Sequence, residues 1–359
     1  MTDVTINLMW LRPGLTGGSE NFAINLLKAI AEHKPQVRIE IVAPSNVFEA
    51  YPFLSADFET NITKVQSSRV RRVVSENLMF RNHVSSSMVH HMGGTAAITP
   101  RDTKAVTTIY DLQFLEYPEN FSMAKKLFLS KAVPAAIKRS NVICVTSKFV
   151  GDSLLTRFDI PENSIRIIKP SITAPESATG GSGIKTPFVL FPAVTWPHKG
   201  HKFLIKVMEL TEPDVTLVLT GSKGQAHSEV MQSIRNSGAA NRIVHLGRVT
   251  STKLEALYAD ALALVFPSEY EGFGQPLIEA MARGCPVISS DQGAIPETVG
   301  CGGITLPKDE LIWAEEISQL KNKSHRENLT KRGLLRSEQF TSAEAAASQV
   351  AVYNSVIAL

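Results

Sequence analysis

Short apolar runs along the chain alternate with segments of helical apolar spacing, and this alternation predicts parallel sheets covered by helices. In the first half we expect strands at residues 5–11, 37–42, 88–91, 105–110, 142–145 and 165–168, with helices between most of them. The first helix has its apolar residues at positions that form one buried face, namely Phe22, Ile24, Leu26, Leu27 and Ile30. Such alternation is typical of a doubly wound α/β sheet, so the first half is expected to be one Rossmann-like domain.

The same pattern restarts after a segment with the composition of a linker. Residues 170–187, PSITAPESATGGSGIKTP, are rich in Pro, Ser, Thr and Gly. Strands are then expected at residues 188–191, 215–220, 243–246, 261–268 and 286–289, with helices at 202–210, from Leu254 and at 277–282. A chain of 359 residues is long enough for two domains, so we expect domains at 1–170 and 171–342.

The stretch from Phe266 to Gly300, FPSEYEGFGQPLIEAMARGCPVISSDQGAIPETVG, carries the clearest candidate site. A strand ends near Pro267, a glycine loop follows, and Pro276 suits the first turn of a helix. Such a loop directs backbone N–H groups and the positive end of a helix dipole to one place, which favours a phosphate. Glu271 and Glu279 flank it, and carboxylates accept hydrogen bonds from sugar and ribose hydroxyls. The alternative is that both glutamates are ordinary exposed residues.

This stretch, with E-G-F-G-x-P-x-x-E at its centre, resembles the Glu-x7-Glu signature of the family 4 retaining glycosyltransferases, which have the GT-B fold. The resemblance implies an α/β protein with two Rossmann-like doubly wound domains and an interdomain cleft. Residues 1–170 would bind the acceptor, residues 171–342 would bind the nucleotide sugar, and the last helix, 343–359, would cross back onto the first domain. Glu271 would contact the donor sugar and Glu279 the ribose. The diphosphate would lie on the amides of Gly272, Phe273, Gly274 and Gln275.

Other segments resemble the same family. Gly17, Gly18 and Glu20 match its G-G-x-E motif, which approaches the donor from the first domain, whereas the loop lacks the G-x-G-x-x-G order of dinucleotide sites. Lys199 matches the family's lysine beside the leaving diphosphate, but the arginine that accompanies it is absent. The loops that hold the nucleotide in relatives are matched by Ser222, Lys223 and Val249.

The acceptor side departs from the family pattern. A family histidine near the reacting carbon is replaced by Tyr110, so Tyr110 or its neighbour Asp111 would supply that contact. Asp111 could accept a hydrogen bond from the acceptor hydroxyl, or it could cap the following loop. His90 and His91 should point to opposite faces of a strand, with one buried and one exposed, and His91 is the acceptor-side candidate.

Composition narrows the function classes. A net charge of +3 is too small to indicate nucleic acid as a partner, and three cysteines in or beside apolar runs suggest reduced thiols in the cytoplasm. The N-terminal segment lacks the features of a signal peptide, and no apolar run approaches the roughly 20 residues of a membrane span. The sequence has no D-x-D motif, so we expect no metal cofactor, with Lys199 and loop amides stabilising the leaving group.

These features together predict a retaining, metal-independent hexosyltransferase of cell-surface polysaccharide synthesis that uses a nucleotide-diphosphate sugar. GDP-mannose is the first expectation for the donor, since the W-P-H-K-G-H and Y-D-L segments resemble bacterial mannosyltransferases. A GT-B epimerase and a non-catalytic nucleotide-sugar scaffold are the alternatives. The acceptor would be a glycan or a lipid-linked glycan. Basic residues at 64–72, and at 125–139 with apolar residues between them, suggest peripheral contact with the inner face of the cytoplasmic membrane, although charge runs of this kind are usually an ordinary solvated face.

Overall fold

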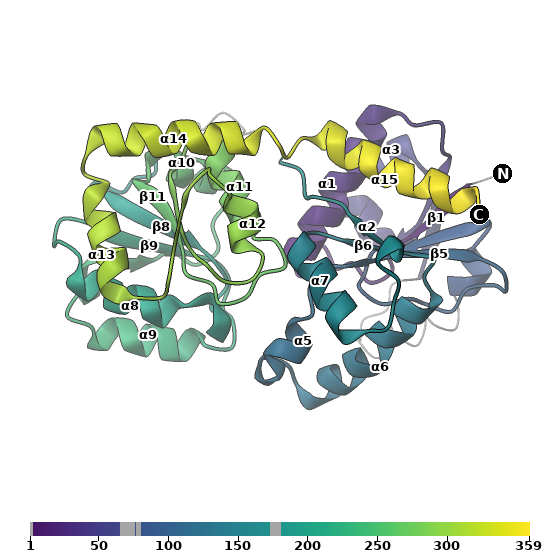
Figure 1. Cartoon of the computed structure of the whole chain (residues 1–359), viewed down its shortest axis with the longest axis horizontal. Helices are drawn as coiled ribbons and strands as arrows, with labels where there is room; N and C mark the ends of the chain where they lie inside the picture. The colour runs from purple at the N-terminus through teal and green to yellow at the C-terminus, as the bar shows by residue number, and fades with distance from the viewer. Residues whose placement is uncertain (1–2, 65–75, 77–79, 173–180) are drawn as a thin grey trace. The chain divides into compact units, whose positions relative to one another are not determined.

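The chain folds as two compact units, which a computed structural model describes for residues 3–64, 76, 80–172 and 181–359 (Figure 1). The first unit comprises Met1–Ser171 and Phe340–Leu359, and the second comprises Ile172–Gln339. The sequence-based division at 170/171 and 342/343 lies close to these boundaries. Most of the predicted linker and the basic segment after Lys64 lie outside the described residues.

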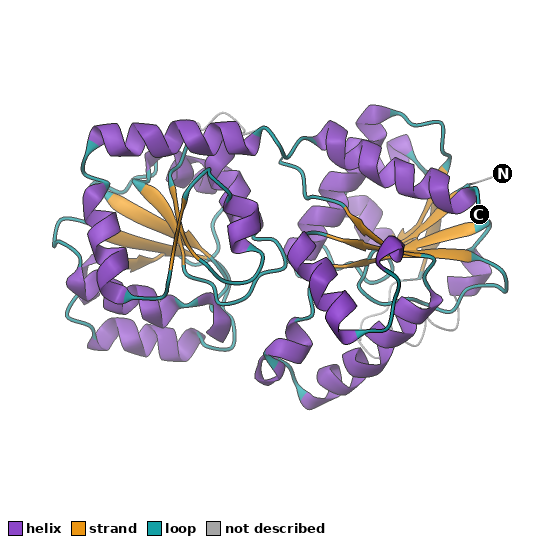
Figure 2. Cartoon of the chain, viewed as in Figure 1, coloured by secondary structure: helices purple, strands orange, loops and turns teal. Residues whose placement is uncertain are grey.

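The first unit is built on a seven-stranded sheet in which every neighbouring pair is parallel. The strands, in spatial order, are β3 (Glu59–Thr63), β2 (Ile39–Pro44), β1 (Val4–Asn7), β4 (Met88–His91), β5 (Lys104–Ile109), β6 (Val142–Val145) and β7 (Ile165–Ile167). Its central strands are buried on both faces, because parallel strands are joined by helices that cover the sheet on both sides (Figure 2).

The main helices of the first unit are α1 (Gly18–His33), α2 (Ser45–Ala50), α3 (Phe53–Asp57), α5 (Gln113–Glu116), α6 (Met123–Arg139), α7 (Lys148–Arg157) and α15 (Ser342–Ile357). Although α15 ends the chain, it packs beside α1 and belongs to the largest hydrophobic cluster of this unit (Figure 1). The hydroxyl of Tyr353 on α15 lies 2.8 Å from Nδ1 of His90 in the sheet. The last helix is therefore an integral part of the first unit.

The second unit contains a six-stranded sheet whose neighbouring pairs are also all parallel. Its strands, in spatial order, are β10 (Ile243–His245), β9 (Thr216–Thr220), β8 (Phe188–Pro192), β11 (Ala263–Phe266), β12 (Val287–Ser290) and β13 (Ile304–Leu306). The helices are α8 (His201–Leu210), α9 (His227–Asn236), α10 (Ser251–Asp260), α11 (Gln275–Ala282), α12 (Ile295–Val299), α13 (Glu310–Gln319) and α14 (Lys323–Ser337). Both units therefore have the predicted doubly wound α/β architecture.

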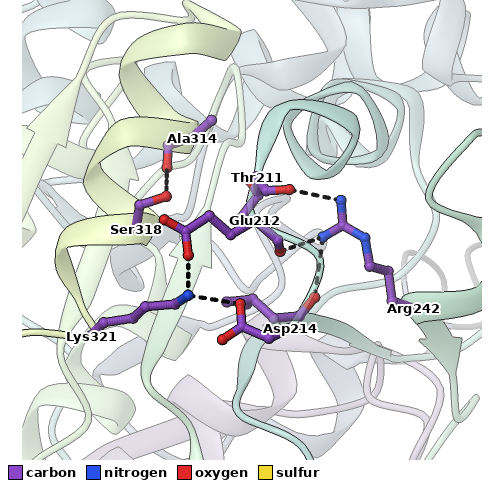
Figure 3. A network of polar contacts seen from close by, with 8 residues as sticks. Thr211, Glu212, Asp214, Arg242, Ala314, Ser318 and Lys321 are labelled. Carbon is purple, nitrogen blue, oxygen red and sulfur yellow. Dashed lines mark hydrogen bonds and ion pairs between the residues drawn. The ribbon is translucent and has the colours of Figure 1, made fainter.

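A polar network ties the end of α8 to its neighbours in the second unit (Figure 3). The Arg242 guanidinium donates to the carbonyl of Thr211 at 2.9 Å and to that of Glu212 at 3.1 Å. Lys321, just beyond α13, pairs with the carboxylates of Glu212 and Asp214. Because the last carbonyls of a helix have no partner within it, a further bond from Arg242 to the Met208 carbonyl satisfies one of them, and the Lys321 pairs tie the loop after α8 to the end of α13.

Some expectations from the sequence are corrected by the structure. The strand predicted at residues 5–11 ends at Asn7, because the following apolar residues form a buried turn in which the Leu11 amide donates to the Leu8 carbonyl. The edge strands β3 and β13 were not predicted, since one is largely exposed and the other is three residues long. His90 and His91 are both buried, because helices cover both faces of β4.

Candidate functional site

The glycine loop after β11 leads directly into α11, as the sequence predicts. Gly274 precedes the helix with a φ of 91°, a conformation that favours glycine, and a Cβ there would lie 2.7 Å from Cδ1 of Leu277. Gly274 has no side chain to cap the helix, and the first turn of α11 contains no acidic residue. The N-terminal end of α11 therefore offers backbone N–H groups and a positive dipole end to an anion.

This loop is fastened to the next strand and helix by three hydrogen bonds. The Thr298 hydroxyl donates to the Phe273 carbonyl at 2.6 Å, and the Ala294 amide donates to the Glu271 carbonyl at 3.1 Å. The Ser290 hydroxyl donates to the Ser268 carbonyl at 2.5 Å. These bonds hold the loop in one shape before any ligand arrives, which lowers the entropic cost of binding.

Lys199 and Glu271 form an ion pair, with Nζ 2.5 Å from Oε1. The two residues follow the adjacent strands β8 and β11, and their side chains are 18% and 14% exposed. The pair is positioned by the backbone, because the Glu269 amide donates to the His198 carbonyl at 2.8 Å. Gly200, with φ 79°, approaches so closely that a Cβ there would lie 2.7 Å from the Pro267 carbonyl oxygen. Both residues were predicted as site residues, but their pairing was not.

Glu279 lies on α11 and is half-buried, with the Tyr258 hydroxyl donating to its Oε2 at 3.2 Å. Burial raises the pKa of this carboxyl, while the nearby Arg283 guanidinium lowers it. Arg283 is itself held by Glu255, with which it forms an ion pair, and it donates to the Glu279 carbonyl at 3.0 Å. Glu279 is thus a positioned carboxyl whose Oε2 has a donor from the protein side, and it can accept hydroxyl groups as well.

The loops after β8, β9 and β10 meet at the same edge of the second sheet. The Gly221 amide donates to the Gly247 carbonyl at 2.8 Å, and the Thr195 amide donates to the Ser222 carbonyl at 3.3 Å. The predicted residues Lys223 and Val249 lie on these loops. The structure therefore brings the nucleotide-site candidates of the second unit to one sheet edge, where parallel α/β sheets bind ligands.

Two buried and two half-buried histidines near this edge were missed by sequence reasoning. Burial lowers the pKa of His198, beside Lys199, to about 3 and that of His201 to about 4. The rings of His227 and His245 are 5.3 Å apart, and their charges would also oppose protonation of His201. His198 and His201 are therefore neutral near pH 7, so Lys199 supplies the cationic charge among residues 198–201. The spacing of these histidines in the sequence gave no signal of the cluster.

In the first unit, Gly17 precedes α1 with φ 78°, and a Cβ there would meet no described atom within 4 Å. Gly17 and Gly18 therefore lie in an open strand-to-helix turn, as predicted. Glu20 is 3% exposed and accepts from the Gly14 amide at 2.7 Å, the Thr16 amide at 3.1 Å and the Tyr51 hydroxyl at 2.5 Å. Glu20 thus holds the loop in shape instead of presenting its carboxylate to a ligand.

One of the predicted acceptor-side residues, His91, is corrected. The Tyr110 hydroxyl donates to the Met92 carbonyl at 2.8 Å, and burial raises its pKa. His91 is 1% exposed, with its Nδ1 3.2 Å from the Asn7 side-chain amide, and burial lowers its pKa to about 3. His91 thus lies in the interior and not on an acceptor-binding surface, whereas Tyr110 is half-buried and its acceptor contact stays a prediction. Asp111 accepts from the Gln113 amide at 3.0 Å, so the capping alternative is observed, while a role with an acceptor hydroxyl stays a prediction.

The second unit is similar to a known protein family. A family model described as Glycosyl transferases group 1 matches residues 176–336. The chain is 28% identical over 254 residues to O-antigen chain mannosyltransferase B of Escherichia coli, an alignment covering 66% of this chain and 67% of that protein. It is 27% identical over 215 residues to O-antigen chain mannosyltransferase RfbU of Salmonella typhimurium, covering 60% of each. The chain thus spans about two thirds or less of these relatives' length.

Solved structures share the fold over the whole chain. Sucrose-phosphate synthase from Thermosynechococcus elongatus has a TM-score of 0.79 at 19% identity and covers 100% of both chains. Anabaena Alr3699/HepE in complex with UDP-glucose has a TM-score of 0.76 at 18% identity, covering 99% of this chain and 100% of that one. At such identities the likeness establishes the fold alone, and that fold is GT-B, as predicted.

Proposed function

We propose that this chain, whose residues 176–336 match the family model described as Glycosyl transferases group 1, is a retaining glycosyltransferase that uses a nucleotide-diphosphate sugar. The acceptor would be a glycan or a lipid-linked glycan in cell-surface polysaccharide synthesis. The observation that carries the proposal is the ion pair between Lys199, after β8, and Glu271, on the loop that leads to the uncapped N-terminal end of α11. A cation, a helix dipole and a carboxylate are the groups that a diphosphate joined to a sugar would need.

The ion pair suggests how donor binding would organise the site. Without donor, the Lys199 ammonium is held by Glu271. A diphosphate carries more negative charge than a carboxylate, so it would compete for the ammonium. Glu271 would then be released to accept hydrogen bonds from sugar hydroxyls, while Glu279 would do the same for the ribose. Donor binding would thus exchange one ion pair for another instead of leaving a half-buried charge alone.

The transfer step follows from these roles. The bond between the anomeric carbon and the diphosphate oxygen breaks, and the electron pair leaves with the diphosphate. Lys199 and the amides of residues 272–275 would stabilise that developing charge. The acceptor hydroxyl would attack from the same face and pass its proton to the departing phosphate, which gives retention of configuration. We propose that this reaction needs no metal, because the cation and the amides would supply the charge stabilisation.

Mannose from GDP-mannose is the proposed donor, supported by the names of the two O-antigen mannosyltransferases to which the chain is similar. UDP-glucose, bound in a structure of the same fold, is the obvious competitor. The identity of the base and sugar depends on the loops that carry Ser222, Lys223 and Val249. An epimerase or a scaffold without turnover would bind a sugar nucleotide at the same place, so binding and turnover require separate assays.

A thermal-shift screen over GDP-, UDP- and ADP-sugars tests donor binding. A ligand at 100 times its Kd stabilises the folded state by about 2.7 kcal/mol, which is readily detected as a rise in melting temperature. We expect GDP-mannose and GDP to give the largest shifts. A larger shift with UDP-glucose would replace mannose as the donor and keep the transfer reaction. Absence of a shift with every sugar nucleotide would contradict the proposed function.

A further inference from the structure

Helix α6 presents an apolar face to solvent at its N-terminal half. Met123, Leu127 and Phe128 are 77%, 58% and 37% exposed. At 100° per residue Met123 and Leu127 lie beside the side through which Val133 and Ile137 enter the core of the first unit, and Phe128 lies further round the helix. Figure 1 shows α5 and α6 at the margin of this unit, on the opposite side from α15. The exposed apolar residues thus widen the apolar side of the helix beyond the part that is covered within its own unit.

The same helix is strongly basic. Its sequence, MAKKLFLSKAVPAAIKR, contains five basic residues and no acidic one, and all five are exposed: Lys125, Lys126, Lys131, Lys138 and Arg139. The nearest acidic residues in sequence precede it, and one of them, Glu116, is paired with Arg157. Glu119, in the turn before the helix, is exposed and offsets one positive charge. The face thus combines large apolar side chains with an excess of cations.

We propose that this face of α6 docks on an anionic lipid surface. Exposed apolar side chains flanked by lysines suit the boundary between headgroups and acyl chains, and each nearby basic residue adds about 1 kcal/mol of attraction. A second copy of the chain is a poorer occupant, because it would bring five cations against five. Within the described residues no helix is long and apolar enough to cross a membrane, so docking would be peripheral. The inference deepens the proposed function and rests on it for its purpose, since a lipid-linked acceptor would be met there.

Vesicle sedimentation of the full chain, without donor or acceptor, tests the proposal. Vesicles of phosphatidylcholine alone are compared with vesicles containing phosphatidylglycerol, at low and high salt. Binding should require the anionic lipid and fall as salt is raised. The variant Lys126→Glu/Lys131→Glu should lower the bound-to-free ratio by at least about tenfold. The variant Leu127→Ser/Phe128→Ser should lower it similarly, with weaker dependence on salt in what remains.

Matched control variants carry the same changes elsewhere. Lys185→Glu/Lys331→Glu alters two exposed lysines of the second unit and gives the same net charge. Leu311→Ser/Leu335→Ser removes two leucines that are 62% and 56% exposed. Both controls should bind vesicles like the parent chain. Equal weakening by test and control variants, equal binding to neutral vesicles, or self-association lost on changing Leu127 and Phe128 would overturn the proposal. None of these results bears on sugar transfer, which is assayed separately.

Discussion

Replacing Lys199 by Ala should weaken the binding of a bare nucleoside diphosphate while leaving the fold intact. The substitution removes one charged partner of the diphosphate and leaves Glu271, 14% exposed, without its ammonium. A hydrogen bond to a charged group contributes about 1.5–3 kcal/mol, so the affinity should fall by about 10- to 150-fold. If the proposed roles are right, the affinity is lost because the Lys199 ammonium is gone, and not because the Lys199–Glu271 ion pair is broken.

The variant Glu271→Gln separates these two possibilities. It keeps a side chain of the same shape but removes the carboxylate that competes with the diphosphate for the Lys199 ammonium. We expect affinity for GDP to stay constant or to rise by up to about fivefold, because an ion pair worth about 1 kcal/mol no longer has to be broken. Turnover should fall strongly, since the sugar would lose its carboxylate contact.

Isothermal titration calorimetry with GDP and UDP measures both effects, and thermal unfolding checks that each variant is folded. Lys308→Ala is the matched control, because Lys308 pairs with Glu269, two residues before Glu271, and its side chain is 26% exposed. This control should change nucleotide affinity by less than about twofold. Equal losses of GDP affinity in Lys199→Ala and Glu271→Gln would refute the reasoning, since the pair would then be a structural support of the loop.

Three further predictions follow from the same geometry. Glu279→Ala should weaken the binding of GDP and of GDP-mannose by the same factor, because both ligands contain the ribose. Unchanged GDP affinity in calorimetry would contradict the assignment of Glu279 to the ribose. Gly274→Ala should lower the free energy of unfolding by about 1–2 kcal/mol in urea denaturation and weaken GDP binding, since φ is 91° at this position. Gly238→Ala serves as the control, because a Cβ at Gly238 meets no described atom within 4 Å. Acid should destabilise the fold through four histidines whose folded-state pKa burial lowers to about 3–4, namely His90, His91, His198 and His201. Their pKa in the unfolded chain is about 6.5, so the unfolded state binds more protons than the folded state as pH falls from 6.5 toward 4. Each histidine should therefore lower the free energy of unfolding by up to about 1.4 kcal/mol per pH unit. Equal unfolding free energies at pH 7.5 and 5.5 would contradict that prediction.

The parts of the fold that sequence reasoning recovered are those with strong local signals. Buried strands such as β4 and β11 are short apolar runs, and the glycine of the α11 turn marks a backbone that other residues adopt poorly. The edge strand β3 was missed because its residues are largely exposed and show no apolar run. Strands at sheet edges are fixed by pairing with a neighbour, which a local pattern does not reveal.

The candidate site was recovered as a set of residues but not as a set of contacts. Lys199 and Glu271 are 72 positions apart, and their ion pair depends on β8 and β11 being neighbours. His91 was expected on the acceptor side because strand alternation does not say which faces other elements cover. The sequence likewise did not predict that the Glu20 carboxylate accepts three hydrogen bonds, because its donors are brought together only by the folded loop and by Tyr51.

The most direct test of the proposed function is nucleoside diphosphate release from sugar nucleotides by the purified chain in the presence of EDTA. GDP-, UDP- and ADP-sugars are compared with and without a crude lipid-linked glycan acceptor, for the parent chain and for Lys199→Ala and Glu271→Gln. We expect one sugar nucleotide, GDP-mannose first, to be cleaved by the parent chain, and both variants to be strongly impaired. A chain that binds sugar nucleotides but releases no nucleoside diphosphate under any of these conditions would contradict the proposed transfer reaction and support a scaffold.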